Sequence, residues 1–455
     1  MKPSPVSLFK KVEKAIELFG HISPEQRSEL AAKQYSTLPL THIVDEILVK
    51  KERIEQVLNA HSTPCYLLDL ENLERSIHRY QEAFRNSLPA LRHFYAVKLN
   101  HEPTLLKTIF AQGFGADVSS ARELLLAKEA GAQTFLFSGP GKTKEELQAA
   151  IAYGSAVTIN VDNFCELDRL KTVVTAPLNI GVRVSVSEHG AWDKFGIPLE
   201  ELAQFVNAVK ESPLLSLRGI QFHISWNQDS TKYIAAIEKL GAALQNPALA
   251  PLCSQLEFID IGGGFRPYQS EGFFTEDTTE GALISAVQAI LEDDTAAEAL
   301  ALPPVLLTEA VTIESYAKAI TNALQEYLVP LGNFTFYTEP GRIIVNDAMH
   351  VAVSVVDVKN QQCVITDGGT NIVGFERFEF DYFPVINLSN PSRTEREATV
   401  YGSLCMPQDY WGKYAFSAEF REGDRIIIPY QGALTYANMN DFIKGRAPVF
   451  ILNKP

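Results

Sequence analysis

One lysine stands at the end of an apolar run. Phe94–Val97 is apolar throughout, and Lys98 follows it directly. Such a run predicts a buried strand, and a buried strand does not end in an ammonium group without a reason. Desolvation at this position would favour the free amine, which could act as a nucleophile and form a Schiff base. The alternative is a lysine whose stem lies along the strand end with its charge in water. The run alone does not distinguish the two.

The elements that would position this lysine follow a regular alternation. From about residue 62, short apolar segments alternate with helical patterns. The predicted strands are Phe94–Val97, Ala116–Val118, Phe135–Ser138, Val157–Val161, Ile180–Val184, Ile220–His223, Phe258–Ile261 and Phe334–Glu339. Eight such units favour a parallel (β/α)8 TIM-type barrel over an open doubly wound sheet. The acidic stretch Glu292–Asp294, before the last strand, is expected to be a surface insertion.

In barrels of this type the functional side chains gather at the C-terminal ends of the strands. Here those ends carry Lys98, Asp117, His223, Gly262, Gly263, Gly264 and Glu339, with Arg342 three residues further on. Three glycines let backbone N–H groups approach a phosphate, although a plain tight turn has the same sequence. A carboxylate at the eighth strand could hold a protonated pyridine nitrogen, and the arginine could bind a phosphate; a structural ion pair is the alternative. The histidine could stack on a planar ring or be an ordinary satisfied polar residue. Together these residues describe a pocket for pyridoxal phosphate.

Two further regions flank the predicted barrel, which we place at residues 62–342. Residues 1–61 are predicted to form a helical extension, with a helix start at Ser23–Gln26. Residues 343–455 are predicted to form a separate β-domain, because strand-like segments follow one another without regular helices. The segment Pro64–Asp69 could join that β-domain or bridge it to the barrel.

Composition excludes several classes of function. The chain has 455 residues and a formal net charge of -15, which argues against nucleic acid or an anionic membrane as partner. No apolar run approaches the roughly 18 residues of a membrane span. The five cysteines are scattered, so the sequence suggests neither a metal site nor a disulfide framework. The first residues contain no apolar signal-peptide core, and a cytoplasmic location is expected.

The order of these motifs resembles the fold-type III pyridoxal-phosphate decarboxylases, the group of diaminopimelate, ornithine and arginine decarboxylases. The resemblance covers about residues 62 to 440. The blocks that carry it are Tyr95–Asn100, Gly115–Ser120 with Glu123 and Leu124, Ser138–Thr143, Lys194–Gly196, Phe222–His223, Asp260–Phe265, Glu339–Arg342, Asp367–Gly369 and Gly402–Cys405 with Asp409. Any one block is weak, but the ordered set is specific.

The resemblance implies roles for the predicted residues, with pyridoxal 5'-phosphate as the cofactor. Lys98 would carry the cofactor, His223 would stack on its ring, and Glu339 would keep its pyridine nitrogen protonated. Asp117 would lie near the lysine end of the cofactor. The phosphate would be held by the amides of the glycine run together with Gly341 and Arg342.

The resemblance also implies a homodimer with shared active sites. Cys405, from the second domain of the partner subunit, would contact the amino-acid substrate and protonate the product; a buried core cysteine is the alternative. Asp367 and Asp409 would lie near the substrate, although both could equally be turn or loop aspartates.

Three departures from the family pattern concern the predicted site. Ser225 and Trp226 stand where the family has Gly-Ser, so Ser225 would have to supply the phosphate contact. Met406 replaces the acidic residue that binds a distal ammonium, and a thioether cannot pair with an ammonium. Leu434 replaces a phosphate-binding tyrosine. Tyr436 could substitute for it, because residues two apart in a strand share a face.

The first hypothesis is therefore a decarboxylase that removes the α-carboxylate of an amino acid, which Met406 suggests is modified or conjugated. A racemase of the same fold is a second hypothesis, against which the Cys405 block and Glu339 argue. A non-catalytic relative that binds a partner protein is a third.

Overall fold

The computed structural model describes residues 38–85, 91–186, 194–225, 227, 229–267, 311–374 and 384–452. The helix start predicted at Ser23–Gln26, the acidic stretch Glu292–Asp294 and Trp226 lie outside these residues.

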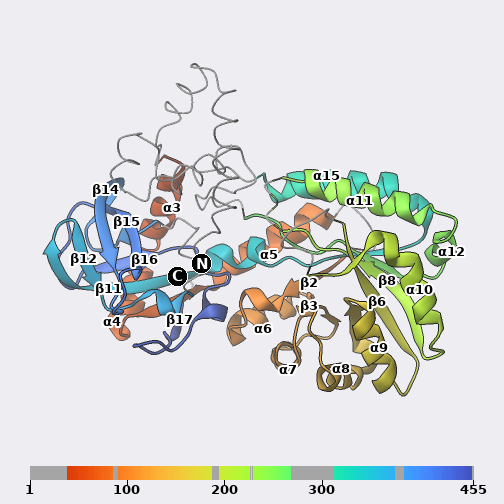
Figure 1. Cartoon of the computed structure of the whole chain (residues 1–455). Helices are drawn as coiled ribbons and strands as arrows, with labels where there is room; N and C mark the ends of the chain where they lie inside the picture. The colour runs from red at the N-terminus through yellow and green to blue at the C-terminus, as the bar shows by residue number, and fades with distance from the viewer. Residues whose placement is uncertain are drawn as a thin grey trace, which may run out of the picture.

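Eight parallel strands close into a barrel, shown on the right of Figure 1. They are β2 (Leu91–Ala96), β3 (Gly115–Val118), β4 (Phe135–Phe137), β5 (Val157–Val161), β6 (Leu178–Ser185), β8 (Leu215–Gln221), β9 (Phe258–Asp260) and β10 (Thr335–Thr338). The order is β5-β4-β3-β2-β10-β9-β8-β6, and pairing of β5 with β6 closes the ring. The two-residue strand β7 (Ile197–Pro198) adds to the end of β6. The predicted TIM-type barrel is confirmed.

Helices and short turns connect the strands on the outside of the barrel. They are α5 (Leu70–Arg85), η1 (Val97–Leu99), α6 (Pro103–Ala111), α7 (Ala121–Glu129), α8 (Lys144–Ile151), η2 (Gly154–Ala156), α9 (Phe164–Val173), η3 (Leu199–Glu201), α10 (Leu202–Lys210), α11 (Thr231–Leu244), α12 (Ala250–Cys253), α15 (Ile313–Tyr327), η4 (Val329–Leu331), α16 (Arg342–Val345) and η5 (Asn346–Ala348). Side-chain caps fix several starts: Ser120 caps α7, Asn163 caps α9, and Thr143 with Glu146 forms a capping box on α8.

A second sheet lies on the left of Figure 1. Its strands are β1 (Cys65–Asp69), β11 (Met349–Asn360), β12 (Cys363–Thr366), β13 (Ile386–Asn387), β14 (Pro391–Tyr401), β15 (Tyr410–Ser417), β16 (Arg425–Ile428) and β17 (Val449–Leu452). Strand β1 lies between β11 and β17, antiparallel to the first and parallel to the second. It runs directly into α5. The segment Pro64–Asp69 thus both joins the β-domain and leads into the barrel, which begins at α5 rather than at residue 62.

The described part of the predicted N-terminal extension consists of α3 (Leu38–Val49) and α4 (Lys51–Ala60). Their apolar faces pack on the second sheet, where Ile47 and Ile54 share one buried cluster with Leu67 and Ile427. These helices therefore belong to the core of the β-domain. Among the described helices, none is long and apolar enough to span a membrane.

Candidate active site

Lys98 lies in a tight turn immediately after the strand. Strand β2 ends at Ala96, and Val97–Leu99 forms the single turn η1. Val97 and Leu99 are buried, whereas the Lys98 side chain is exposed. The two apolar neighbours are buried and leave the Lys98 side chain exposed. The burial that the sequence predicted for this amine is therefore not found.

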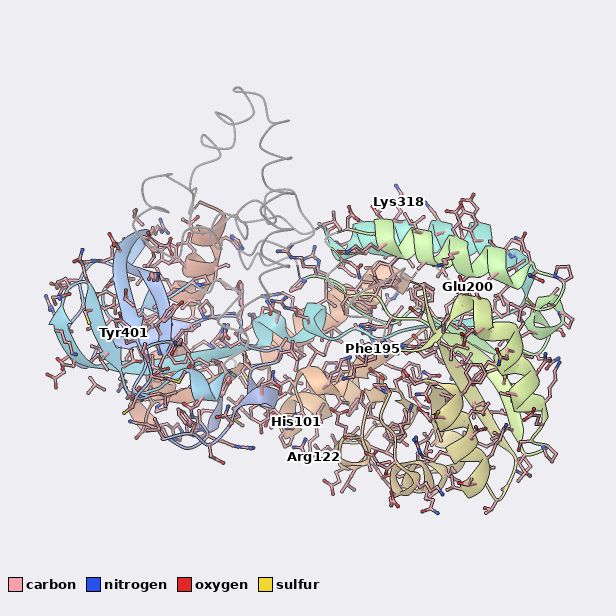
Figure 2. All side chains as sticks on the ribbon, viewed as in Figure 1. His101, Arg122, Phe195, Glu200, Lys318 and Tyr401 are labelled. Carbon is pink, nitrogen blue, oxygen red and sulfur yellow. The ribbon has the colours of Figure 1, made fainter. Side chains whose placement is uncertain are left out.

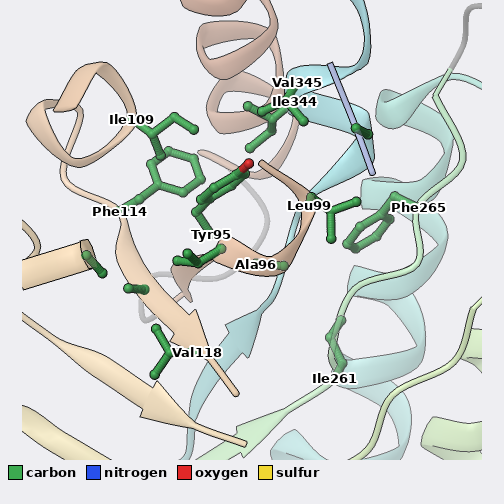
Figure 3. Close-up of a cluster of buried hydrophobic side chains, with 14 of the residues drawn as sticks. Tyr95, Ala96, Leu99, Ile109, Phe114, Val118, Ile261, Phe265, Ile344 and Val345 are labelled. Carbon is green, nitrogen blue, oxygen red and sulfur yellow. The ribbon is translucent and has the colours of Figure 1, made fainter. Parts of the chain in front are cut away.

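Contacts from two directions hold the lysine turn in place. Figure 3 shows Leu99 among apolar side chains, including Ala96 and Phe265. The Leu99 carbonyl accepts a hydrogen bond from the Leu434 amide at 2.8 Å. The side-chain amide of Asn100 donates to the Gly432 carbonyl, also at 2.8 Å. The second domain's segment around Gly432 thus fixes the backbone on which Lys98 stands.

Glu339 is a buried carboxylate just beyond β10. Its Oε1 accepts from Nε2 of Gln221 at 3.1 Å, and its Oε2 lies 3.2 Å from Nδ1 of His223. Burial raises its pKa, but hydrogen bonds with His223 and Asp260, and the charge of Lys98, outweigh burial and lower the pKa to about 2. Glu339 is therefore ionised near neutral pH, as a partner for a protonated pyridine nitrogen must be.

His223 lies between Glu339 and Ser225. Burial lowers its pKa, although the hydrogen bond with Glu339 acts in the opposite direction. The Gly263 amide donates to its Nδ1 at 3.1 Å, and its Nε2 lies 3.0 Å from Oγ of Ser225. A proton on Nδ1 would let the ring donate to Glu339, whereas a proton on Nε2 would let it accept from Gly263 and donate to Ser225, so these contacts fit either neutral tautomer. Ser225, which was predicted to contact the phosphate, forms a hydrogen bond with His223 here.

Two further acids complete the buried cluster. Asp117, at the end of β3, has its pKa raised to about 8 by burial and by the charge of Glu339, while Lys98 opposes the shift. The pKa of Asp260 is also raised, first by burial and then by Glu339. Of these three acids, Glu339 therefore holds the negative charge and the other two tend to keep their protons.

The glycine run packs against neighbouring backbone rather than standing open. Gly262 and Gly264 have φ values of 70° and 90°. A Cβ on Gly263 would lie 2.1 Å from the Glu339 carbonyl, and one on Gly264 would lie 1.9 Å from the Ile224 carbonyl. Only glycine allows this approach.

The predicted phosphate cradle is smaller than expected. The Gly262 amide already donates to Asp260 at 2.9 Å, and the Gly263 amide to His223. Gly264 remains the amide of the run without an acceptor in the described part of the chain. Arg342 opens α16 directly after Gly341, whose Cβ would lie 2.8 Å from Leu99. One amide and one guanidinium near the lysine turn still fit a phosphate.

Tyr436 does not lie on a strand. Leu434 has a left-handed φ of 62°, and the chain then enters the turn η8 (Tyr436–Asn438). The strand-based argument that Tyr436 shares a face with Leu434 is therefore wrong. The Tyr436 ring lies 5.3 Å from that of His101 and 6.0 Å from that of Tyr66.

The two aspartates predicted near the substrate are held by internal partners. Asp409 is buried, and its carboxylate accepts from the amides of Thr370 at 2.7 Å and Leu404 at 2.6 Å. Asp367 accepts from the Ser354 amide at 2.8 Å and from the Thr63 hydroxyl. Between Leu404 and Asp409, Cys405 is exposed and Met406 is half-buried.

Two polar residues of this region were not predicted from the sequence. Gln221 is buried beneath Glu339, and Arg183 is buried on β6 with its guanidinium 4.6 Å from the Phe195 ring. The available signal was a polar or charged residue inside an otherwise apolar strand.

The chain is similar to known pyridoxal-dependent decarboxylases. The family model described as "Pyridoxal-dependent decarboxylase, pyridoxal binding domain" matches residues 74–303. Diaminopimelate decarboxylase of Helicobacter pylori is 27% identical over 403 residues, which cover 83% of this chain and 87% of the relative. L-glutamyl-[BtrI acyl-carrier protein] decarboxylase of Niallia circulans is 24% identical over 424 residues, covering 86% and 89%.

Solved structures show the same fold. The Helicobacter pylori diaminopimelate decarboxylase complexed with L-lysine has a TM-score of 0.69 at 24% identity, covering 88% of this chain and 94% of its own. Lysine/ornithine decarboxylase from Vibrio vulnificus, complexed with putrescine, also has a TM-score of 0.69, at 22% identity, covering 89% and 98%. The barrel fold and the matched family model together show that this chain belongs to the pyridoxal-dependent decarboxylase family.

Proposed function

We propose that the chain removes the α-carboxylate of an amino acid with the help of pyridoxal phosphate. The observation that carries this proposal is one constellation at the strand ends: an exposed Lys98 amine, an ionised Glu339 and a neutral His223. When bound, pyridoxal phosphate supplies an electron sink for the electron pair left by departing CO2.

The chain's own residues have distinct tasks in this proposal. Lys98 would hold the cofactor through its amine. Glu339 holds a proton on the pyridine nitrogen, and a carboxylate there favours decarboxylation over racemisation. His223 would contact the cofactor's ring, and Gly264, Gly341 and Arg342 would hold its phosphate. Asp117, with its raised pKa, stands beside the Lys98 amine as a neutral acid.

We further propose a homodimer in which Cys405 of one subunit completes the site of the other. Cys405 is exposed in the single chain, as a residue presented to a partner must be. Asp409 and Asp367 would act by positioning, since their carboxylates are engaged with neighbouring backbone or side-chain groups. The cysteine would return a proton to the substrate carbon after CO2 has left.

In this proposal the substrate is not an amino acid with a distal ammonium, such as diaminopimelate or ornithine. Met406 offers no charge to a distal ammonium. A relative acts on a glutamyl group carried by an acyl-carrier protein, which fits a conjugated amino acid here. The cytoplasmic location stays a prediction, and five free cysteines are compatible with it.

Lys98 can be tested through the cofactor's colour. The purified holoenzyme should absorb near about 420 nm, as expected of a lysine-bound pyridoxal phosphate. Lys98→Ala should abolish that band. Lys318→Ala, on the outer face of the barrel (Figure 2), should keep it. A band that persists in Lys98→Ala would show that another group holds the cofactor.

The reaction itself is tested by CO2 release from a panel of L- and D-amino acids, with chiral analysis of the products. Stoichiometric CO2 and amine support decarboxylation. Inversion of the substrate without CO2 would establish a racemase instead. A colourless protein without either activity would indicate the non-catalytic relative.

A further inference from the structure

Basic and polar side chains from three distant parts of the chain meet beside the lysine turn. His101 follows β2, Arg122 lies in the first turn of α7, and Arg446 lies in the loop before β17. Nη2 of Arg122 is 3.1 Å from Nε2 of His101, and Figure 2 labels the two side by side on the flank of the barrel nearer the second sheet. The Tyr436 ring packs on His101. We call His101, Arg122, Tyr436 and Arg446 the basic rim.

The basic rim brings two arginines close to one imidazole. Burial lowers the pKa of His101, and the charges of Arg122 and Arg446 lower it further, so both arginines lie close to the imidazole. Arg122 donates to a histidine, and among the described residues no carboxylate forms an ion pair with it. Glu123 beside it accepts from the Ser119 amide at 2.7 Å. Arg446 pairs with the exposed Asp441, whose Oδ2 lies 3.8 Å from its Nε, so Arg122 is the arginine of the rim that lacks a carboxylate partner in the described part of the chain.

The groups of the basic rim are hydrogen-bond donors. His101 accepts from Arg122 through Nε2, which leaves a proton on Nδ1 of the neutral ring. The Tyr436 hydroxyl and two exposed guanidinium groups add further donors. Such a set matches an oxyanion, a carboxylate or a phosphate, and repels an ammonium.

Hydrogen bonds from other parts of the second domain hold the loop that carries Arg446. The buried Asn371 side chain donates to the carbonyls of Asn440 and Lys444, each at 3.1 Å. Nζ of Lys444 lies 3.4 Å from the Asp367 carbonyl. Ile443, at the loop's tip, has a left-handed φ of 59°, which is strained for a β-branched residue and typical of functional loops.

The basic rim is distinct from the cofactor's phosphate cradle. The cradle lies at the ends of β9 and β10, with Gly264 and Arg342. His101 and Arg122 of the rim instead follow β2 and β3. His101 is three residues from Lys98, and α7, which carries Arg122, contacts η1, so the rim lies beside the lysine turn.

We propose that the basic rim binds an anionic group at the far end of the amino-acid substrate, a carboxylate or a phosphate. This inference rests on the decarboxylase function proposed above. It agrees with Met406, which removes the negative charge that a cationic tail would need. The substrate class is thus an amino acid with an acidic rather than a basic tail.

The test uses the holoenzyme and the variants Arg122→Gln, Arg446→Gln and their double variant, with Lys318→Gln as the matched surface control. Substrates with a terminal carboxylate, such as L-glutamate, are compared with L-lysine and L-ornithine. For acidic tails KM should rise by about tenfold in each single variant, with kcat changed less than about twofold. Inorganic phosphate should inhibit the wild-type competitively and the double variant about tenfold more weakly. Stronger inhibition by phosphate than by a terminal carboxylate identifies a phosphate tail.

Three results overturn the inference. One is a wild-type preference for L-lysine or L-ornithine. Another is an equal loss of kcat on every substrate in the variants, which would indicate a structural role. The last is a change of oligomeric mass in Arg122→Gln, measured by light scattering, which would make the rim a subunit contact. Failure of the decarboxylase proposal is separate, because then no amino acid of the panel releases CO2 from the coloured wild-type enzyme.

Discussion

At the scale of single residues, the site is defined by which of its acids carries charge. Glu339 receives hydrogen bonds from Gln221 and contacts His223, so it holds the negative charge. Asp117 and Asp260 are equally buried, but their raised pKa values favour the protonated form. The one negative charge of these acids is therefore on Glu339, which contacts His223 and is close enough to Lys98 for the charge of the lysine to lower its pKa.

Glu339→Gln tests this charge. The amide keeps the shape of the side chain but cannot stabilise a proton on the pyridine nitrogen. We expect the cofactor to remain bound while kcat falls by about a hundredfold, the size found when one preorganised electrostatic contact is removed. Glu200→Gln, on the exposed surface (Figure 2), is the control. Wild-type kcat in Glu339→Gln would exclude the proposed role.

Sequence reasoning located residues that stand at strand ends, such as Lys98, His223 and Glu339, because the barrel's alternation fixes where strands end. It could not locate Tyr436, since the left-handed φ of Leu434 breaks the two-residue period on which the argument relied. It also could not separate Gly264 from its neighbours, because the Gly263 amide finds its acceptor, His223, after another strand, and the Gly262 amide turns back to Asp260 of its own strand.

At the scale of elements, a buried ion pair joins three parts of the barrel. Nζ of Lys142 contacts Oε1 of Glu166 at 2.8 Å and the carbonyls of Gly139 and Asn160 at 2.7 and 2.9 Å. The lysine follows β4, the asparagine ends β5, and the glutamate lies in the first turn of α9. Burial lowers the pKa of Lys142 and raises that of Glu166, and each partner opposes the other's shift.

Lys142→Met should destabilise the protein by about 3–5 kcal/mol, because it leaves Glu166 buried without a partner. Urea unfolding at neutral pH measures the loss. The double variant Lys142→Met with Glu166→Leu should recover part of it, since both charges are then removed together. The exposed pair Lys171–Glu211 is the control, where Lys171→Met should cost less than about 1 kcal/mol. A small loss in Lys142→Met, equal to that control, would contradict the argument.

At the scale of the whole molecule, a polar network joins the N-terminal helices to the second sheet and to the first helix of the barrel, α5. Nζ of Lys50 contacts Glu46, Asn72 and Asp69, and the Tyr430 hydroxyl donates to Glu46 at 2.6 Å. These groups come from α4's cap, α3, α5, β1 and the segment after β16. The sequence predicted helices before residue 61, but not what they cover, because the decisive partner lies more than three hundred residues away.

His350, at the start of β11 beside this network, predicts acid sensitivity. Burial lowers its pKa from 6.5 to about 4, with the charges of Asp69 and Glu46 opposing. A histidine with a lowered folded pKa contributes stability above 6.5, and this contribution is lost as pH falls through about 4. His350→Asn should therefore lose less stability than the wild-type between pH 6.5 and 4, by about 2 kcal/mol in urea unfolding. Parallel pH profiles would show that His350 is not the group that titrates.

Subunit mixing tests whether the catalytic unit is larger than one chain. Lys98 lies on the barrel and Cys405 on the exposed loop of the second domain, so in a shared site they come from different subunits. Lys98→Ala and Cys405→Ala homodimers should each be nearly inactive. Dissociated and reassociated together, they form mixed dimers in which one site carries both changes and the other carries neither. Random pairing should restore about one quarter of wild-type activity. A mixture as inactive as its parents, despite mixed dimers shown by mass spectrometry, would place both residues in the same subunit's site.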